Sequence, residues 1–141
     1  MKNPFMELAI LEAQKDKNEI PVGAVLVRDK TVIAAAHNEC VAKSGICHAE
    51  LLAIFRGLEL LGTTYLEDCE LYVTKEPCIM CFGALVNARI KRVYFGCYDV
   101  KYGAMEYVER LGYLHKINHT PEIYGGIMEP ECKKLLEDFF R

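Results

Sequence analysis

The sequence contains no apolar run that approaches the roughly 18 residues needed to cross a bilayer as a helix. Its first residues, Met1–Glu7, lack the uninterrupted apolar region of a secretory signal peptide. It also lacks the repeats, linkers and low-complexity segments that mark divisions between domains. These absences predict one domain over residues 1–141 that is cytoplasmic and has no membrane partner.

The cysteines lack the even number that a disulfide framework requires. The chain has 7 of them and no export signal, so a set of disulfides is disfavoured. We assign Cys78 and Cys81 to a metal site. Free cysteine behaves as a small apolar residue, so the remaining five are expected to be buried. These five are Cys40, Cys47, Cys69, Cys97 and Cys132.

The chain also lacks an excess of positive charge. Its net charge is −3, which does not indicate a broad surface for nucleic acid. Residues 1–70 hold 7 Lys/Arg and 11 Asp/Glu, a balance of −4, whereas residues 71–141 hold 10 and 9, a balance of +1. Any contacts with phosphate are therefore expected from the second half.

A hydrophobic fraction of 52% in 141 residues is enough for a substantial core, and its periodicity predicts alternating helices and strands. Helices are expected over 4–16, 48–61, 78–87, 104–113 and 130–141, and strands over 21–27, 31–37, 70–74, 92–96 and 122–124. The first two strands are joined by three polar residues, 28–30, and are expected to form an antiparallel hairpin. The order strand, helix, strand over 70–96 predicts a right-handed parallel crossover.

Two short motifs predict a metal site with catalytic chemistry. Cys78 and Cys81 are three residues apart at the start of a helix after Pro77, so their sulfurs can share one ion. A catalytic zinc site takes three protein ligands and leaves a fourth position for water, which makes His48 the expected third ligand. Glu50, two residues further on, is placed to carry protons to and from that water. His-x-Glu followed by Pro-Cys-x-x-Cys is the signature of zinc-dependent nucleobase deaminases, in which the glutamate is not a ligand.

Nearly the whole chain resembles the cytidine deaminase superfamily and, within it, the bacterial tRNA adenosine deaminases. The resemblance is carried by Pro21–Val25, His48–Glu50, Leu71–Thr74, Glu76–Cys81, Asp99–Ala104 and Asp138–Arg141. It implies a three-layer α/β/α fold with a five-stranded mixed sheet flanked by helices. It also implies a homodimer with one Zn²⁺ per chain. The implied reaction is hydrolysis of a wobble adenosine to inosine in a tRNA anticodon stem-loop.

The same resemblance implies which residues contact the substrate. These are Asn38, Ala49, Pro77, Asp99, Lys101, Asn118, Phe140 and Arg141. The backbone N–H groups of Ala49 and Cys78 are expected to position the water and the amine. Phe82 departs from the small residue usual after the second cysteine and is expected to narrow the pocket or a dimer contact.

Three other functions stay open on the sequence. Cys78 and Cys81 alone would suit a redox Cys-x-x-Cys pair, but that leaves His48 and Glu50 unexplained. A deaminase of a free nucleobase or nucleotide, of guanine or cytosine type, would suit the acidic balance. A non-catalytic zinc-binding partner subunit would suit the metal motif but not an intact Glu50.

Overall fold

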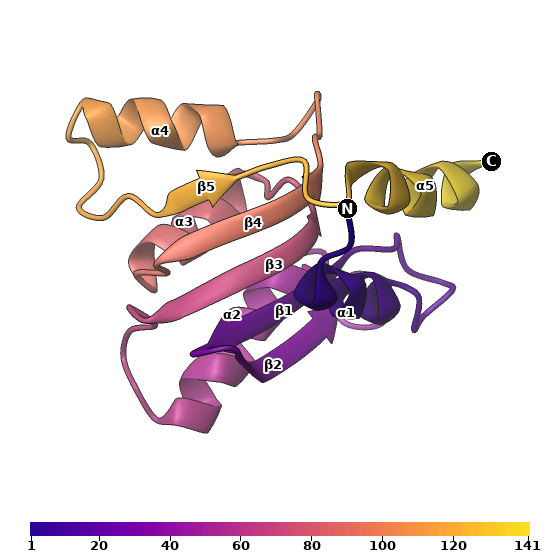
Figure 1. The fold of residues 1–141 in the computed structure, drawn as a ribbon, viewed down its shortest axis with the longest axis horizontal. Helices are drawn as coiled ribbons and strands as arrows, with labels where there is room; N and C mark the ends of the chain where they lie inside the picture. The colour runs from indigo at the N-terminus through magenta and orange to yellow at the C-terminus, as the bar shows by residue number, and fades with distance from the viewer.

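The structure, a computed structural model, describes residues 1–141 and contains one five-stranded sheet and five helices (Figure 1). The helices are α1 (Pro4–Ala13), α2 (Ala49–Leu61), α3 (Ile79–Asn87), α4 (Met105–Tyr113) and α5 (Glu129–Phe140). The strands are β1 (Gly23–Arg28), β2 (Thr31–His37), β3 (Cys69–Lys75), β4 (Arg92–Cys97) and β5 (Glu122–Tyr124). Every predicted element is present, with differences at the ends.

The sheet is mixed, as expected, with the strand order β2-β1-β3-β4-β5. β1 pairs antiparallel with β2 and β3, and β4 pairs parallel with β3 and β5. The turn between β1 and β2 differs from the prediction, because Arg28 still pairs with Thr31 and only two residues connect the strands. Asp29 and Lys30 have φ angles of 49° and 61°, the left-handed pair that matches the twist of a tight hairpin.

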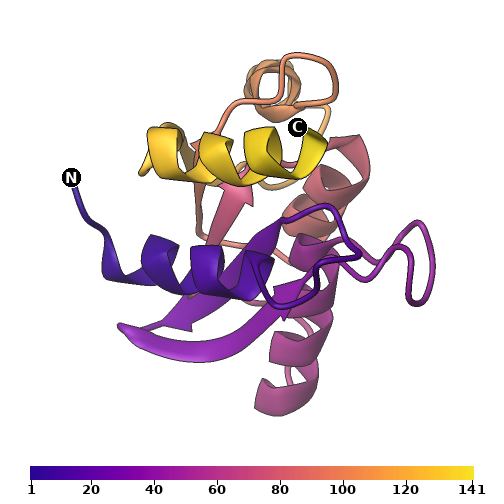
Figure 2. The ribbon, with the colours of Figure 1, turned by 90° about the vertical axis from the view of Figure 1, so that its right-hand side faces the viewer.

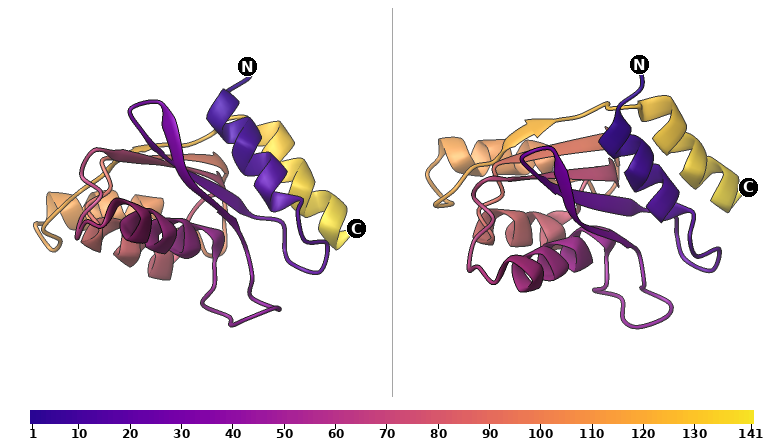
Figure 3. Two further views of the ribbon diagram at one scale, coloured as in Figure 1. Left: turned by 90° about the horizontal axis from the view of Figure 1, so that it is seen from below. Right: turned by 60° about the horizontal axis from the view of Figure 1, so that its bottom comes forward.

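Helices cover both faces of the sheet and give the predicted three layers. α1 and α5 lie side by side on one face, and α2, α3 and α4 lie on the other (Figures 2 and 3). β1 is buried on both faces: Val25 and Val27 pack towards α1, whereas Ala24 and Leu26 belong to the larger core beneath α2 and α3. This explains why β1 reads as a continuous apolar run.

The helix ends follow local chemistry. Asn3 caps α1 by accepting the N–H groups of Phe5 and Met6, at 3.1 and 2.9 Å. α1 ends at Ala13, earlier than predicted, and the Asp16 carboxylate then accepts the Asn18 N–H at 2.9 Å in a turn. Gly62 ends α2 with a φ of 62°, as expected of a C-terminal glycine. None of the five helices combines the length and apolar character needed to cross a membrane.

Candidate metal and catalytic site

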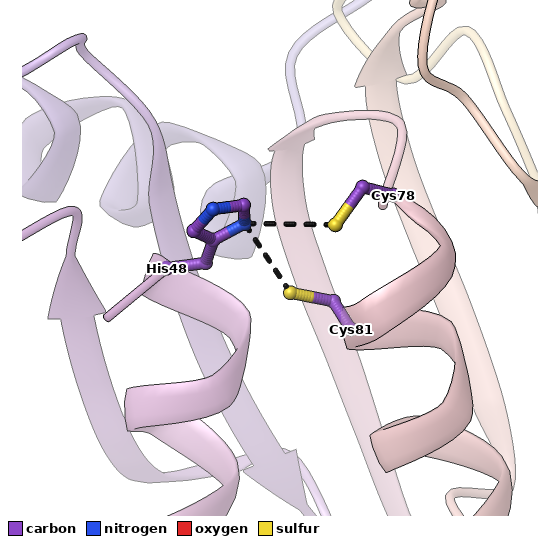
Figure 4. A group of neighbouring side chains, drawn as sticks. All are labelled: His48, Cys78 and Cys81. Carbon is purple, nitrogen blue, oxygen red and sulfur yellow. Dashed lines mark hydrogen bonds between the residues drawn. The ribbon is translucent and has the colours of Figure 1, made fainter. Parts of the chain in front are cut away.

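The metal-binding side chains come from the starts of two neighbouring helices (Figure 4). His48 is the residue before α2 and Cys78 the residue before α3, and both have extended backbone, with ψ angles of 150° and 175°. Cys81 lies in the first turn of α3. Because His48 is outside the helix, its ring is free of the helical spacing that would separate it from Glu50. α3 begins just past the carboxyl end of β3, where α/β sheets commonly hold ligands.

The three side chains are spaced for one zinc ion. Nδ1 of His48 lies 3.6 Å from Sγ of Cys78 and 3.6 Å from Sγ of Cys81. All three ligand atoms lie within 4.8 Å of one another. Zinc–nitrogen bonds of about 2.0–2.1 Å and zinc–sulfur bonds of about 2.3 Å at tetrahedral angles place nitrogen and sulfur about 3.5–3.6 Å apart. The group therefore fits Zn²⁺ with three protein ligands and one open position.

The two thiols do not share their protons equally before metal binds. Hydrogen bonds from Cys81 and then from His48 lower the pKa of the Cys78 thiol to about 3. The pKa of Cys81 is raised, because its S–H is hydrogen-bonded to Cys78 and its side chain is buried. Cys78 is thus ready as a thiolate, whereas zinc must displace the proton of Cys81.

Glu50 is buried beside the three ligands but is not one of them. Its side chain is 4% exposed, and Oε1 has no hydrogen-bond partner. Burial raises the pKa of its carboxyl. A buried carboxylate without a partner is unfavourable for folding and usually has another role. Glu50 lines a cavity together with His48 and Cys78, where its carboxyl group can accept and return a proton.

The unfavourable burial of the Glu50 carboxyl gives a prediction for the metal-free protein. Once the pH exceeds about 4.5 the unfolded chain releases the Glu50 proton, whereas the folded chain, whose pKa is raised, still holds it. Folding is therefore destabilised as pH rises through that value, until the folded carboxyl also ionises. We expect Glu50→Gln to raise the midpoint of thermal unfolding more at about pH 8 than at about pH 4. Thermal scans with a chelator at both values measure this, and an equal difference at both would contradict it.

A cavity of about 320 Å³ opens beside the metal ligands. Its walls come from four segments of the chain, within residues 20–22, 38–50, 75–78 and 99–102. The volume is at the lower end for small-molecule sites and suits a single base or nucleoside.

Two of the residues expected to contact substrate are in this wall. Asn38 is 9% exposed; its Oδ1 accepts the Ala49 N–H at 2.9 Å and its Nδ2 donates to the Ile20 carbonyl at 3.2 Å. Asp99 pairs with Lys75 across the cavity wall at 3.1 Å. Its burial favours the neutral acid, but the Tyr102 amide and Lys75 outweigh this and lower the pKa of Asp99.

Ala49 and Pro77 lie behind the wall. The Ala49 amide is already bonded to Asn38 and is not free to hold a water or an amine in this structure. The Pro77 carbonyl accepts the Ala104 N–H at 3.0 Å. Both residues are buried and shape the cavity through these bonds.

The other four expected contacts lie outside the cavity. Lys101 is exposed beside it, and Phe140 and Arg141 are exposed at the end of α5, which projects beyond the carboxyl ends of β3 and β4 (Figure 1). Asn118 lines a separate hollow with Asn87, at the far end of α3 from Cys78. With a rise of about 1.5 Å per residue, α3 alone places roughly 13 Å between these ends.

Two residues of the site were missed in the sequence. Lys75, the last residue of β3, lines the cavity and is its only cationic side chain apart from the His48 ring. Glu76 is 9% exposed and accepts the N–H groups of Asp99 and Met105, at 3.0 and 3.2 Å. Their place at the carboxyl end of a buried strand, directly before the cysteines, is the signal that indicates them.

The cysteines outside the metal site are not all buried. Cys69, Cys97 and Cys132 are buried as predicted, but Cys40 and Cys47 are half-buried in the loop before His48. Cys40 lines the cavity, and burial, followed by Glu19, raises the pKa of its thiol. The prediction was wrong for these two because residues 39–47 contribute no side chain to either hydrophobic core cluster.

Phe82 corrects another expectation. It is 1% exposed in the core beneath the sheet and does not line the cavity. α3 turns it away from the metal ligands, so it leaves the width of the cavity unchanged.

Comparisons with known proteins agree with this geometry. Residues 1–97 match the family model described as the cytidine and deoxycytidylate deaminase zinc-binding region. The tRNA-specific adenosine deaminase of Bacillus subtilis is 44% identical over 140 residues, covering 97% of this chain and 87% of that protein.

Solved structures show the same likeness. One, from work on A-to-I editing by tRNA:A34 deaminases at the wobble position, is 40% identical, with a TM-score of 0.89 over 96% of this chain and 100% of that chain. Guanine deaminase from Bacillus subtilis is 33% identical, with a TM-score of 0.64 over 76% of this chain and 75% of that chain.

Proposed function

Because this chain belongs to the cytidine and deoxycytidylate deaminase family, we propose that it converts adenosine to inosine by hydrolysis at the wobble position of a tRNA anticodon loop. The proposal rests on one combination of findings: His48, Cys78 and Cys81 are spaced for zinc, and the chain aligns over almost its whole length with its relatives. Those relatives are named tRNA-specific adenosine deaminases. The enzyme is proposed to act in the cytoplasm as a homodimer.

The residues of the site divide the chemistry between them. Zinc held by His48, Cys78 and Cys81 supplies an acidified water, because a bound cation lowers the pKa of water from about 16 towards 7. The Glu50 carboxylate takes one proton from the water and delivers it to the ring nitrogen as the water's oxygen adds to the neighbouring carbon. It then takes the second proton from that oxygen and gives it to the amino group, which leaves as ammonia. No hydrogen bond within the protein occupies Glu50 Oε1. Burial raises the pKa of Glu50 and makes its carboxylate a stronger base.

The cavity walls orient the substrate. We propose that Asn38 and Asp99 bind the flipped nucleoside, with Ala49 and Pro77 setting the shape of the cavity behind it. Lys101, Phe140 and Arg141 would contact the rest of the loop from outside the cavity. Asn118 lies at the other end of α3, outside the cavity. It would contact the substrate only at a second point on the anticodon arm, or at the site of a partner subunit. A single-stranded loop suits this site because its bases are easily unstacked.

A deamination assay tests the proposal directly. An anticodon stem-loop with adenosine at the wobble position should release ammonia and yield inosine. The same stem-loop with adenosine moved to a neighbouring position should react much more slowly. Conversion of free adenosine, cytosine or guanine, with no activity on any RNA loop, would contradict the proposal.

A free-base deaminase is the second candidate. It is favoured by the likeness to the guanine deaminase of Bacillus subtilis at 33% identity and by a cavity sized for one base. That likeness covers only 76% of this chain, against 97% for the tRNA-specific relative. Guanine is therefore the first free base to test.

If RNA is the substrate, its binding should be sensitive to salt. Each neutralised phosphate releases counterions, so log K should fall with log[salt]. We expect Lys101→Ala and Arg141→Ala each to reduce this slope by roughly one unit. Lys91→Ala is the matched control, because Lys91 is exposed at the amino end of β4, away from the cavity. Filter binding of the stem-loop over a salt series measures the slopes; equal slopes in all four proteins would exclude these contacts.

A further inference from the structure

The segment between β4 and α4, residues 98–104, borders the cavity, and hydrogen bonds fix its backbone. Oδ1 of Asp99 accepts the N–H groups of Lys101 and Tyr102, at 3.1 and 3.0 Å. Oδ2 of the same carboxylate pairs with Lys75 at 3.1 Å. The Gly103 N–H donates to the Asp99 carbonyl at 2.9 Å. Asp99 therefore holds this turn through both its side chain and its backbone carbonyl.

The buried acid Glu76 ties this segment to the strand that precedes the zinc ligands. The Glu76 carboxylate accepts the N–H groups of Asp99 and Met105, at 3.0 and 3.2 Å. A side chain at Gly103 would collide with the Glu76 carboxyl, so glycine permits this close approach. The Ala104 N–H donates to the Pro77 carbonyl at 3.0 Å. The position of the segment is thus fixed relative to the metal ligands.

This fixed backbone holds an aromatic ring in solvent. Tyr102 is 62% exposed and lines the same cavity as His48 and Glu50. The Lys101 ammonium lies 5.2 Å from the centre of its ring. An exposed ring forgoes the stabilisation that burial of its apolar surface would give.

The other tyrosine of the segment is a useful contrast. Tyr98 packs edge-on against Phe95, with ring centres 4.9 Å apart and planes at 85°, and it borders a different hollow. No such aromatic partner is found for Tyr102. Both rings are largely exposed, Tyr98 by 57% and Tyr102 by 62%, but only Tyr102 lines the cavity of the metal site.

We propose that Tyr102 stacks on the base next to the reacting adenosine in single-stranded RNA, and so favours a polynucleotide over a free nucleoside; this inference rests on the proposed function. A base that enters the cavity leaves its neighbour with an open face. An aromatic ring at the cavity replaces that lost stacking, and a ring tolerates any base because every base has a π-face. The ammonium of Lys101 beside the ring is placed to neutralise the neighbour's phosphate.

The test is a cycle that removes the ring and the neighbouring base separately and together. The proteins are the zinc-loaded wild type, Tyr102→Ala and Tyr102→Phe. Tyr113→Ala is the matched control, because Tyr113 is 83% exposed and lies at the end of α4. The substrates are an anticodon stem-loop with a wobble adenosine and the same loop with an abasic nucleotide immediately 5′ or 3′ of that adenosine.

On the intact loop, Tyr102→Ala should lower kcat/KM roughly tenfold, mainly through KM, because loss of one stacked base typically has an effect of this size. Tyr102→Phe and Tyr113→Ala should stay within about twofold of wild type. On one of the two abasic loops, Tyr102→Ala should lower kcat/KM by less than about twofold, because the stacked base is already missing.

An undiminished loss on both abasic loops would overturn the proposal, as would equal losses for the alanine and phenylalanine variants. Either result in a wild type that deaminates the intact loop leaves the proposed function standing. A wild type that converts no RNA loop contradicts the proposed function itself.

Discussion

Glu50→Gln is expected to retain about one zinc per chain and a folded structure, yet to lose turnover by roughly 10²–10⁴-fold or more. Glutamine has nearly the shape of glutamate but cannot accept and return a proton. The side chain is not among the three metal-spaced ligands, so metal content should not change. Its Oε1 has no partner in the protein, so the substitution breaks no hydrogen bond of that oxygen. Elemental analysis together with steady-state deamination measures both parts.

Glu12→Gln is a suitable control for this experiment. Glu12 is also a buried acid, but it lies on α1, pairs with Lys15 at 2.6 Å and does not line the cavity of the metal site. It should keep both zinc and activity. Near-normal turnover in Glu50→Gln would remove Glu50 from the proton transfers, and loss of zinc in that variant would make it a ligand.

Much of this site could be predicted because its chemistry is local in sequence. His48 and Glu50 are two residues apart, and Cys78 and Cys81 are three apart, so spacing alone indicated one metal and one acid. The periodicity of the flanking segments then placed both pairs at helix starts. The structure places His48 just before α2, outside the helix predicted over 48–61, and this position lets His48 and Glu50 line the same cavity.

The cavity wall depended on contacts that spacing does not encode. Glu76 bonds to amides 23 and 29 residues further along the chain, and Lys75 pairs with Asp99 only because β3 and β4 lie side by side. Side chains on this edge are predictable as a group, but their partners are not. Asn118 is a different case. The resemblance implied a contact with substrate, but this residue lies at the end of α3 that is far from the zinc ligands.

Loss of one zinc thiolate should remove the metal and leave no measurable deamination. Cys81→Ala and Cys78→Ala each leave two protein ligands, fewer than the three that catalytic zinc sites use. Without the ion no acidified water is available at neutral pH, so activity should fall to background. Binding of zinc to the folded chain stabilises it, so a chelator should lower the unfolding midpoint of the wild type and have little effect on either variant.

Cys97→Ala separates the loss of a ligand from the loss of a buried cysteine. Cys97 is 3% exposed at the end of β4, and its thiol donates to the Thr74 carbonyl at 3.5 Å, outside the metal group. This variant should keep about one zinc per chain, its activity and its response to chelator, although the small cavity it creates should cost some stability. Cys81→His tests the ligand role from the other direction, because imidazole also binds zinc and should restore part of the metal content. Full zinc content in both Cys78→Ala and Cys81→Ala would show that the ion binds elsewhere.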